Sequence, residues 1–309
     1  MHELIKLLAE VRPLRDPVLL ASFAGRGGSS ATAAVQYRVD HWHALPVAEI
    51  DEQESFDFTV RRPHVRIEHG ERMLTWPSNK IYVASPTILG TPHSSARDFI
   101  LLPGMEPHLR WQSFCDAVTD LAKALGCTSA VVLGSRAGSV PHTRPVPFRL
   151  TTTDPEFTRL FDQQEPTVPN YEGPTGLQTV IALHLQAAGL RVASLSAMTP
   201  FYLSLDPNPQ AISAIAQAID GAFGTATGLE DLDAQLSEVD TAAEEALQES
   251  PQLRAAVASM EQQIDWTRGA QPKPGAEPAA TELPAGSEVV AELEQFLREQ
   301  RGGGTSSSS

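Results

Sequence analysis

Short apolar runs alternate with helical patterns through the first two-thirds of the chain. Buried strands are predicted where consecutive apolar residues are bounded by glycine, proline or serine, and these runs cover residues 17–25, 80–86, 98–104, 128–135 and 191–198. Helices are predicted where apolar positions repeat every three or four residues, and these segments cover residues 31–39, 108–125, 171–189 and 207–224. Such alternation predicts an α/β fold, with a mostly parallel sheet flanked by helices.

A different pattern occupies residues 56–77. Apolar and polar residues alternate there with a period of two, and Gly70 interrupts the alternation. A turn residue between two alternating runs is typical of a β-hairpin. We therefore expect a hairpin that decorates the main sheet.

Beyond Gly228 the strand patterns stop and only helical patterns remain. Apolar residues repeat at three- and four-residue intervals over 229–246, and a second narrow stripe covers 253–264. Narrow stripes of this kind suit pairing with another helix. We expect an α/β core domain over residues 1–224 and an acidic helical hairpin over residues 225–267.

The remaining residues divide into three short segments. Residues 268–286 are rich in proline, alanine, glycine and glutamate, which is typical of a flexible linker. Residues 287–301 place apolar side chains on one face of an amphipathic C-terminal helix. Residues 302–309 contain only glycine, threonine and serine, and we expect a disordered tail.

The net charge of −15 is concentrated in this helical extension. Residues 226–301 contain 16 acidic and 5 basic residues, a net charge of −11, which leaves −4 for the rest of the chain. A sustained negative field repels phosphate backbones and anionic membrane surfaces. The expected partners therefore include neither nucleic acid nor membrane.

The two cysteines indicate the compartment. Cys115 and Cys127 both lie within apolar runs, which is typical of packed thiols in a reducing environment. Acidic residues interrupt the N-terminal apolar positions, and no apolar stretch is long enough for a membrane span. We expect a soluble, cytoplasmic protein, in which neither thiol is a favoured nucleophile.

A glycine-rich turn follows the first predicted strand. Gly27, Gly28 and Ser29 precede a helix, where backbone N–H groups can receive a phosphate or carboxylate. The turn matches neither a dinucleotide-binding fingerprint nor a Walker A loop. The alternative is a tight strand-to-helix turn with Ser29 as the N-cap.

Two further segments offer polar side chains. His142 and Arg144 follow the strand predicted at 128–135 and could bind a carboxylate or donate a proton, but Arg144 could equally pair with an acidic residue at a subunit contact. Glu172 lies at the start of the helix predicted over 171–189, where it could act as a catalytic acid or simply complement the helix dipole. These alternatives stay open.

Catalytic and metal-binding motifs are not recognisable. Ser135 lacks the glycine spacing of a nucleophile elbow. His41 and His43 could supply two metal ligands, but no second cluster of ligand residues follows at familiar spacing. We therefore assign no catalytic residue and expect neither a metal nor a cofactor.

Eight segments occur in a characteristic order along the chain. They are LLASFAG with its helix (19–35), FDFTVRRP (56–63), TWP (75–77), LLPGMEPHLRW (101–111), VVLGS with PHTRP (131–145), YEGPTG (171–176), SLSAMTPFYL (194–203) and the proline-rich entry to the helix at 207–224. In this order they resemble the proteasome assembly chaperones of the second type, in the long form found in actinobacteria. The resemblance implies a core similar to that of purine nucleoside phosphorylases. It also implies homo-oligomers, for example trimers, and a chaperone-like role toward proteasome subunits.

Two hypotheses about function follow from the sequence. The first is a non-catalytic, oligomeric binding or assembly protein, whose partners are other copies of itself and a further protein, with proteasome subunits as candidates. The second is a small-molecule-binding protein or enzyme, phosphorylase- or hydrolase-like, acting on an anionic or nucleoside-like metabolite. Its site would use Gly27, Gly28, Ser29, His142, Arg144 and Glu172.

Overall fold

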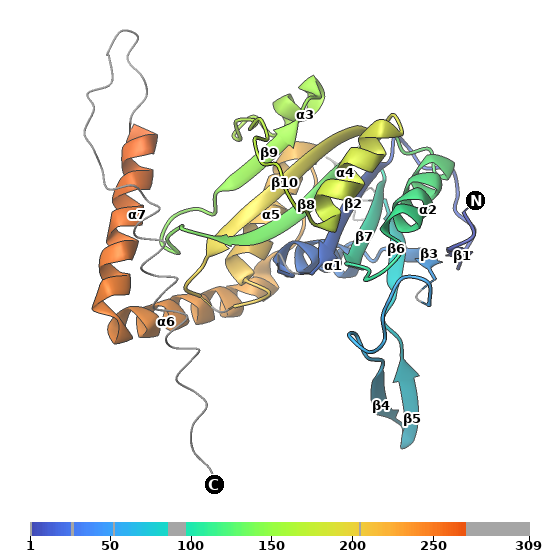
Figure 1. The fold of residues 1–309 in the computed structure, drawn as a ribbon, viewed down its shortest axis with the longest axis horizontal. Helices are drawn as coiled ribbons and strands as arrows, with labels where there is room; N and C mark the ends of the chain where they lie inside the picture. The colour runs from blue at the N-terminus through green and yellow to red at the C-terminus, as the bar shows by residue number, and fades with distance from the viewer. Residues whose placement is uncertain (1, 26–27, 52, 86–96, 204, 270–309) are drawn as a thin grey trace. The chain divides into compact units, whose positions relative to one another are not determined.

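A computed structural model describes residues 2–25, 28–51, 53–85, 97–203 and 205–269. Within these residues, helices cover both faces of an eight-stranded sheet (Figure 1), which confirms the α/β fold class. The strands are, in spatial order, β1 (Ile5–Leu7), β3 (Leu45–Ile50), β6 (Asn79–Ala84), β7 (Phe99–Met105), β2 (Val18–Ala24), β8 (Ser129–Gly138), β10 (Arg191–Pro200) and β9 (Phe148–Thr152).

The sheet is parallel at its centre and antiparallel toward its edges. β7, β2, β8 and β10 pair in parallel, as the strand and helix alternation predicts. β1, β3 and β6 extend one side in antiparallel pairs, and β9 pairs antiparallel with β10 on the other. β1 and β3 were not predicted, because β1 has only three residues and the pairing of β3 shifts register between Pro46 and Ala48.

Two helical layers bury the apolar residues of the sheet. One layer contains α2 (Trp111–Ala124) and α4 (Leu177–Ala187), and the other contains α1 (Ser30–His41), α3 (Pro155–Leu160) and α5 (Pro209–Phe223). The start of α5 agrees with the sequence, since the Asn208 side chain accepts a hydrogen bond from the Ala211 N–H and Pro209 occupies the first turn.

One predicted helix begins later than expected. The pattern predicts a helix over 171–189, but α4 starts at Leu177. Gly173 has a φ of 153°, and Pro174 disfavours helical geometry in the residue before it. Residues 171–176 therefore form a loop in front of the helix.

The predicted hairpin is present but shorter. It consists of β4 (His64–Glu68) and β5 (Glu71–Thr75), joined through His69 and Gly70, which both have positive φ. Paired positive φ values suit the right-handed twist of a tight hairpin. Residues 56–63 are not part of it, because the Asp57 carboxylate accepts hydrogen bonds from the Thr59 N–H and hydroxyl and forms a local turn.

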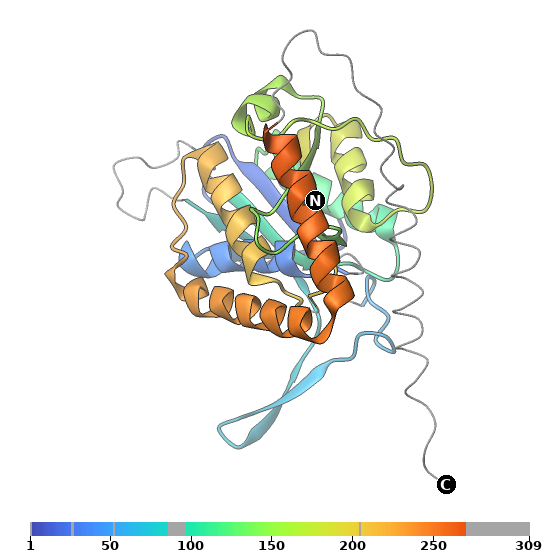
Figure 2. The same cartoon turned by 90° about the vertical axis from the view of Figure 1, so that its left-hand side faces the viewer.

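All residues of β4 and β5 are exposed. Figures 1 and 2 both show the hairpin projecting away from the main sheet. An isolated two-stranded ribbon is only marginally stable in water. A second surface that covers the hairpin would therefore stabilise it.

The acidic extension begins with a short 3-10 turn (Glu230–Leu232), followed by α6 (Asp233–Glu249) and α7 (Pro251–Gly269). Within α6, the buried residues Val239 and Ala243 pack against Leu203 of the core. Figures 1 and 2 show the two helices meeting at a steep angle rather than lying side by side. The apolar stripe of α6 thus covers the core and not α7, which differs from the hairpin expected over 225–267.

A buried ion pair connects α1 to the segment that leads into α6. The Arg38 guanidinium is fully buried and donates to the Ala216 carbonyl at 2.6 Å and to the Asp220 carboxylate at 3.3 Å. Asp220 also accepts from the Thr225 hydroxyl at 2.7 Å and the Thr227 N–H at 2.9 Å. Asp220 therefore fixes both the end of α5 and the start of the extension.

The C-terminal predictions can be compared with the structure only in part. α7 ends at Gly269, two residues into the predicted linker at 268–286. The rest of that linker, the predicted helix at 287–301 and the predicted tail at 302–309 lie outside the described residues. Among the described helices, none combines the length and apolar character needed to cross a membrane.

Candidate functional site

The turn after β2 brings α1 against a carboxylate of the same chain. Ser29 donates to the Asp206 carboxylate from its backbone N–H at 2.7 Å and from its hydroxyl at 2.8 Å. Gly28, at a φ of 107°, lies beside the same carboxylate. The N-terminus of a helix favours negative charge. In this fold Asp206 supplies that charge from within the chain.

The first turn of α1 is also tied to two other segments. The Ala31 N–H donates to the Ser135 hydroxyl at 3.4 Å, and the Asn208 N–H donates to the Ser30 hydroxyl at 2.9 Å. Ser29 is the N-cap residue by position, but its side chain makes no capping hydrogen bond. Ser29 therefore occupies the predicted N-cap position, but its N–H and hydroxyl donate to Asp206 instead of its side chain accepting from the helix. Gly27 lies outside the described residues.

Replacing Asp206 with alanine should lower the free energy of unfolding by about 0.5–2 kcal/mol, the usual contribution of a helix-capping group. The substitution removes both hydrogen bonds to Ser29 and the charge at the start of α1. Urea denaturation monitored by circular dichroism measures the change. Asp206→Asn should lose less than Asp206→Ala, because an amide oxygen still accepts a hydrogen bond. An Ala variant as stable as the wild type would contradict this assignment.

A second carboxylate lies at the start of α4. Glu106 directly follows β7, and its side chain accepts from the Leu177 N–H at 3.4 Å. A Cβ atom on Gly25 would lie only 2.2 Å from the Glu106 carboxylate, so the turn after β2 closely approaches this side chain. The carboxyl ends of β2 and β7 are thus lined by groups that pair within the chain.

Sequence reasoning missed both of these carboxylates. Glu106 had a usable signal, because it is an acidic residue immediately after a buried strand. Asp206 had no such signal in the sequence, because 177 positions separate it from Ser29. Only the folded chain brings those two residues together.

His142 forms a link between two loops. Its backbone N–H donates to the Tyr202 hydroxyl at 2.9 Å, and its Nδ1 lies 2.6 Å from the same hydroxyl, which can then donate to the ring. Burial lowers the pKa of His142, against the opposing effect of Asp240, Glu261 and Glu244. A neutral ring that accepts from Tyr202 suits a structural role better than proton donation.

Arg144 and Glu172 have different surroundings. The Arg144 guanidinium lies 3.6 Å from the Glu261 carboxylate of α7, and neighbouring Thr143 hydrogen-bonds the same carboxylate. Glu172 belongs to the exposed 171–176 loop. Among the described residues, no hydrogen bond or ion pair joins Glu172 to His142 or Arg144. The predicted site residues therefore belong to separate contacts, and a shared site remains only a prediction.

The thiols and the histidines do not form a reactive centre in the described part of the chain. Burial raises the pKa of Cys115 to about 12 and that of Cys127 to about 11, so both are protonated near neutral pH. No group of three or more His, Cys, Asp or Glu side chains in the described ranges is arranged to hold a metal ion.

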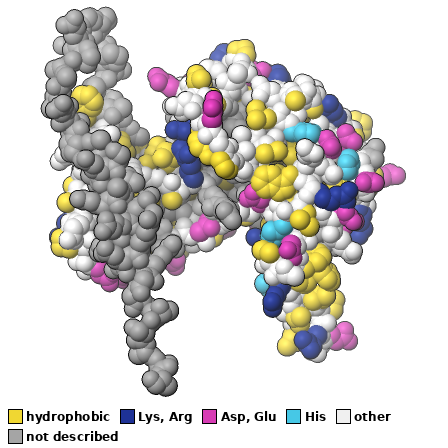
Figure 3. Space-filling view, viewed as in Figure 1, with side chains coloured by type: hydrophobic (Ala, Val, Ile, Leu, Met, Phe, Trp, Pro, Cys, Tyr) yellow, Lys and Arg dark blue, Asp and Glu magenta, His cyan; other side chains and the backbone are white. Residues whose placement is uncertain are grey.

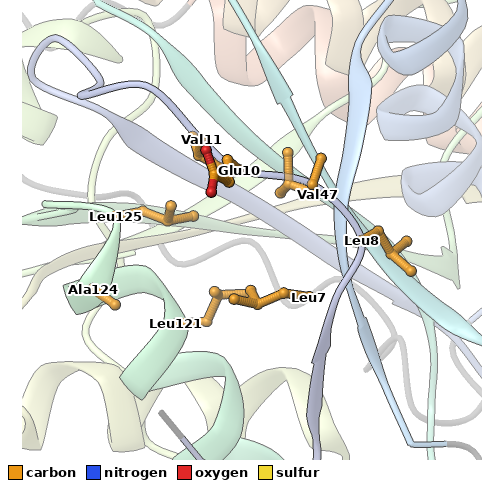
Figure 4. A pocket seen from close by; sticks show the side chains of 9 residues that line it. Leu7, Leu8, Glu10, Val11, Val47, Leu121, Ala124 and Leu125 are labelled. Atoms are coloured by element: carbon orange, nitrogen blue, oxygen red, sulfur yellow. The ribbon is translucent and has the colours of Figure 1, made fainter.

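An apolar hollow lies beside the N-terminal segment (Figure 4). Its volume is about 660 Å³, and Leu7, Leu121 and Leu125 line it together with one ionisable side chain, Glu10. Figure 4 shows Leu7 on the N-terminal segment and Leu121 on α2, and both belong to the lining of the hollow. Such a lining can receive an apolar side chain, but it offers no pair of groups for acid–base chemistry.

The β4–β5 hairpin presents an unusual apolar surface. Val65 and Leu74 are directly paired and Ile67 lies two residues from Val65, so the three side chains share one face of the ribbon. Their exposed fractions are 52%, 51% and 76%. Figure 3 shows hydrophobic side chains along the projecting hairpin. We call Val65, Ile67 and Leu74 the hairpin apolar face. A contiguous exposed apolar surface is typical of a protein contact.

These features define an α/β protein with a mixed sheet, buried thiols and an exposed apolar hairpin. A family model described as the PAC2 family matches residues 21–247. The chain belongs to the PAC2 family, which confirms the resemblance drawn from the sequence. Among curated proteins, no match was found.

Solved structures give the same picture. A PAC2 family protein from Streptomyces avermitilis is 36% identical in sequence and superposes with a TM-score of 0.65. The match covers 73% of this chain and 95% of the Streptomyces chain. A proteasome-assembly chaperone homologue from Mycobacterium tuberculosis is 32% identical and has a TM-score of 0.66. That match covers 78% of this chain and 99% of the Mycobacterium chain. An archaeal proteasome activator from Pyrococcus furiosus shares the fold at 13% identity, with a TM-score of 0.61. The match covers 78% of this chain and 97% of the Pyrococcus chain.

Proposed function

We infer that this protein is a non-catalytic, oligomeric binding or assembly protein with a chaperone-like role. The hairpin apolar face carries this proposal, because it is too exposed to serve the monomer. Burying a side chain of this size contributes about 1.5–3 kcal/mol. Other copies of the chain and proteasome subunits are the proposed partners. The latter are suggested by the M. tuberculosis relative, whose description is that of a proteasome-assembly chaperone homologue.

Replacing Ile67 with serine tests the role of the hairpin apolar face. Self-association should weaken by about tenfold or more, because a partner can no longer bury this side chain. Light scattering at several concentrations measures the mass, which should shift toward the 33.3 kDa of a single chain. Co-purification from native cytosol, with identification of proteins by mass, shows whether proteasome subunits are lost as well.

Val168→Ser is the matched control, since Val168 is 89% exposed and lies outside the hairpin. This variant should keep the wild-type mass and the wild-type set of bound proteins. A wild-type protein that stays at the mass of one chain and captures no partner would overturn the proposal. So would an Ile67→Ser variant that matches the wild type in both measurements.

The small-molecule alternative has weaker physical support. Two N–H groups at the start of α1, those of Ser29 and Ala31, already donate to Asp206 and Ser135. His142 and Arg144 are likewise engaged with other side chains. A thermal-shift screen of nucleosides, sugar phosphates and amino acids would favour this alternative if one compound raised the melting temperature.

A further inference from the structure

A basic hollow lies at the foot of the β4–β5 hairpin. Its volume is about 940 Å³. The basic side chains that line it come from the segment before the hairpin, from β4 and from β6, and they are Arg61, Arg62, His64, Arg66 and Lys80. Trp76, with an exposed fraction of 44%, and Tyr82 add aromatic surface. We call this surface the basic hollow. It is a concentration of positive charge on a protein whose net charge is −15.

Within the part of the chain that the structure describes, the cations of the basic hollow have no acidic partner. Among the described residues, no ion pair joins Arg61, Arg62, Arg66 or Lys80 to a carboxylate. Other arginines of the same chain do have such partners, as Arg97 does with Asp16 and Glu156. Like charges that lie close together destabilise one another unless an anion joins them. The basic hollow therefore suits an acidic partner surface.

The same chain carries the complementary surface on α6. Residues 230–249 contain eight carboxylates and neither lysine nor arginine, and all eight acidic residues are exposed. Val239 and Ala243 face the core, while the spacing of Glu238, Glu245 and Glu249 places these three on one side of the helix. Docking on the core therefore leaves the acidic side of α6 free for a second contact.

A second copy is the occupant that these observations favour. No residue of 230–249 lines the basic hollow, so α6 does not fill the hollow of its own chain. Two different surfaces that complement each other form a head-to-tail contact, which generates rings when the rotation closes. We propose that the acidic side of α6 from one copy binds the basic hollow of the next. This contact rests on the proposed oligomeric function and names the surfaces that would produce it.

Charge reversal of each surface tests the contact. Arg62→Glu with Arg66→Glu should weaken self-association by about tenfold or more, because acidic residues would then face acidic residues. Glu238→Lys with Glu245→Lys should have the same effect from the other side. All four substitutions in one chain restore opposite charges and should restore the wild-type mass by light scattering. Raising the salt concentration should weaken the wild-type contact, since exposed charges are screened.

The control reverses charges elsewhere. Asp120→Lys with Lys123→Glu changes two exposed residues of α2 and should leave the mass unchanged. The proposal fails if only one of the two reversals lowers the mass, or if the fourfold variant stays dissociated. If the reversals abolish capture of another protein but leave the oligomeric mass unchanged, that protein is the occupant of the basic hollow. The proposal of a second copy as the occupant is then wrong. If Ile67→Ser lowers the mass and neither reversal does, this contact is wrong while the proposed oligomeric function stands.

Discussion

Replacing Asp220 with alanine is expected to lower the free energy of unfolding by about 3–5 kcal/mol, as when one partner of a buried ion pair is removed. Arg38 has no exposed surface, and Asp220 is the carboxylate that pairs with it. Burial lowers the pKa of the Arg38 guanidinium and Asp220 opposes that shift. The variant leaves a buried cation without a carboxylate, although its guanidinium still donates to the Ala34 and Ala216 carbonyls and lies over the Trp42 ring.

The same substitution also releases the start of the acidic extension. Asp220 accepts hydrogen bonds from Thr225 and Thr227, so its loss should reduce protection from hydrogen exchange in residues 225–232. Chemical denaturation measures the free energy, and Asp120→Ala, at an exposed position of α2, is the control. Arg38→Met combined with Asp220→Leu should cost less than the sum of the single variants, because no unpaired charge remains. Strict additivity would show that the two residues do not act as a pair.

The central fold could be predicted because its signals are local. Six of the seven residues of β2 are buried, so both faces of this strand read as one apolar run. α5 carries its own cap at Asn208 and its own first-turn proline. β9 and β3 gave weaker signals, since both strands are partly exposed and contain mixed residues. Their antiparallel pairing depends on neighbours that are distant in sequence.

The candidate surfaces were harder to predict for the same reason. The hairpin could be located from Gly70 and the alternation around it, but the alternation does not reveal that both faces are exposed. Arg66 and Lys80 lie on different strands, and their common hollow exists only in the fold. The apolar stripe of α6 predicted burial correctly for Val239, yet its partner proved to be Leu203 rather than α7. Periodicity identifies the buried face of a helix and does not identify what covers it.

Replacing Val239 with aspartate should detach α6 from the core. Val239 has no exposed surface and packs with Leu203 and Ala243. An unpaired carboxylate in this contact would cost at least about 3 kcal/mol, so the helix avoids the cost by moving into water. Amide protection from hydrogen exchange over residues 233–249 should fall by about a hundredfold. The transition of the core should change little, because α6 contributes few residues to it.

Ser237→Asp provides the matched control, since it adds the same charge to the exposed side of α6. This variant should retain wild-type protection in the helix. If the acidic side of α6 binds the basic hollow of a second copy, Val239→Asp should also lower the oligomeric mass, because a detached helix no longer presents Glu238 and Glu245 in a fixed position. Equal protection in both variants would show that the contact with Leu203 does not hold α6. Lost protection with an unchanged mass would separate the docking of α6 from self-association.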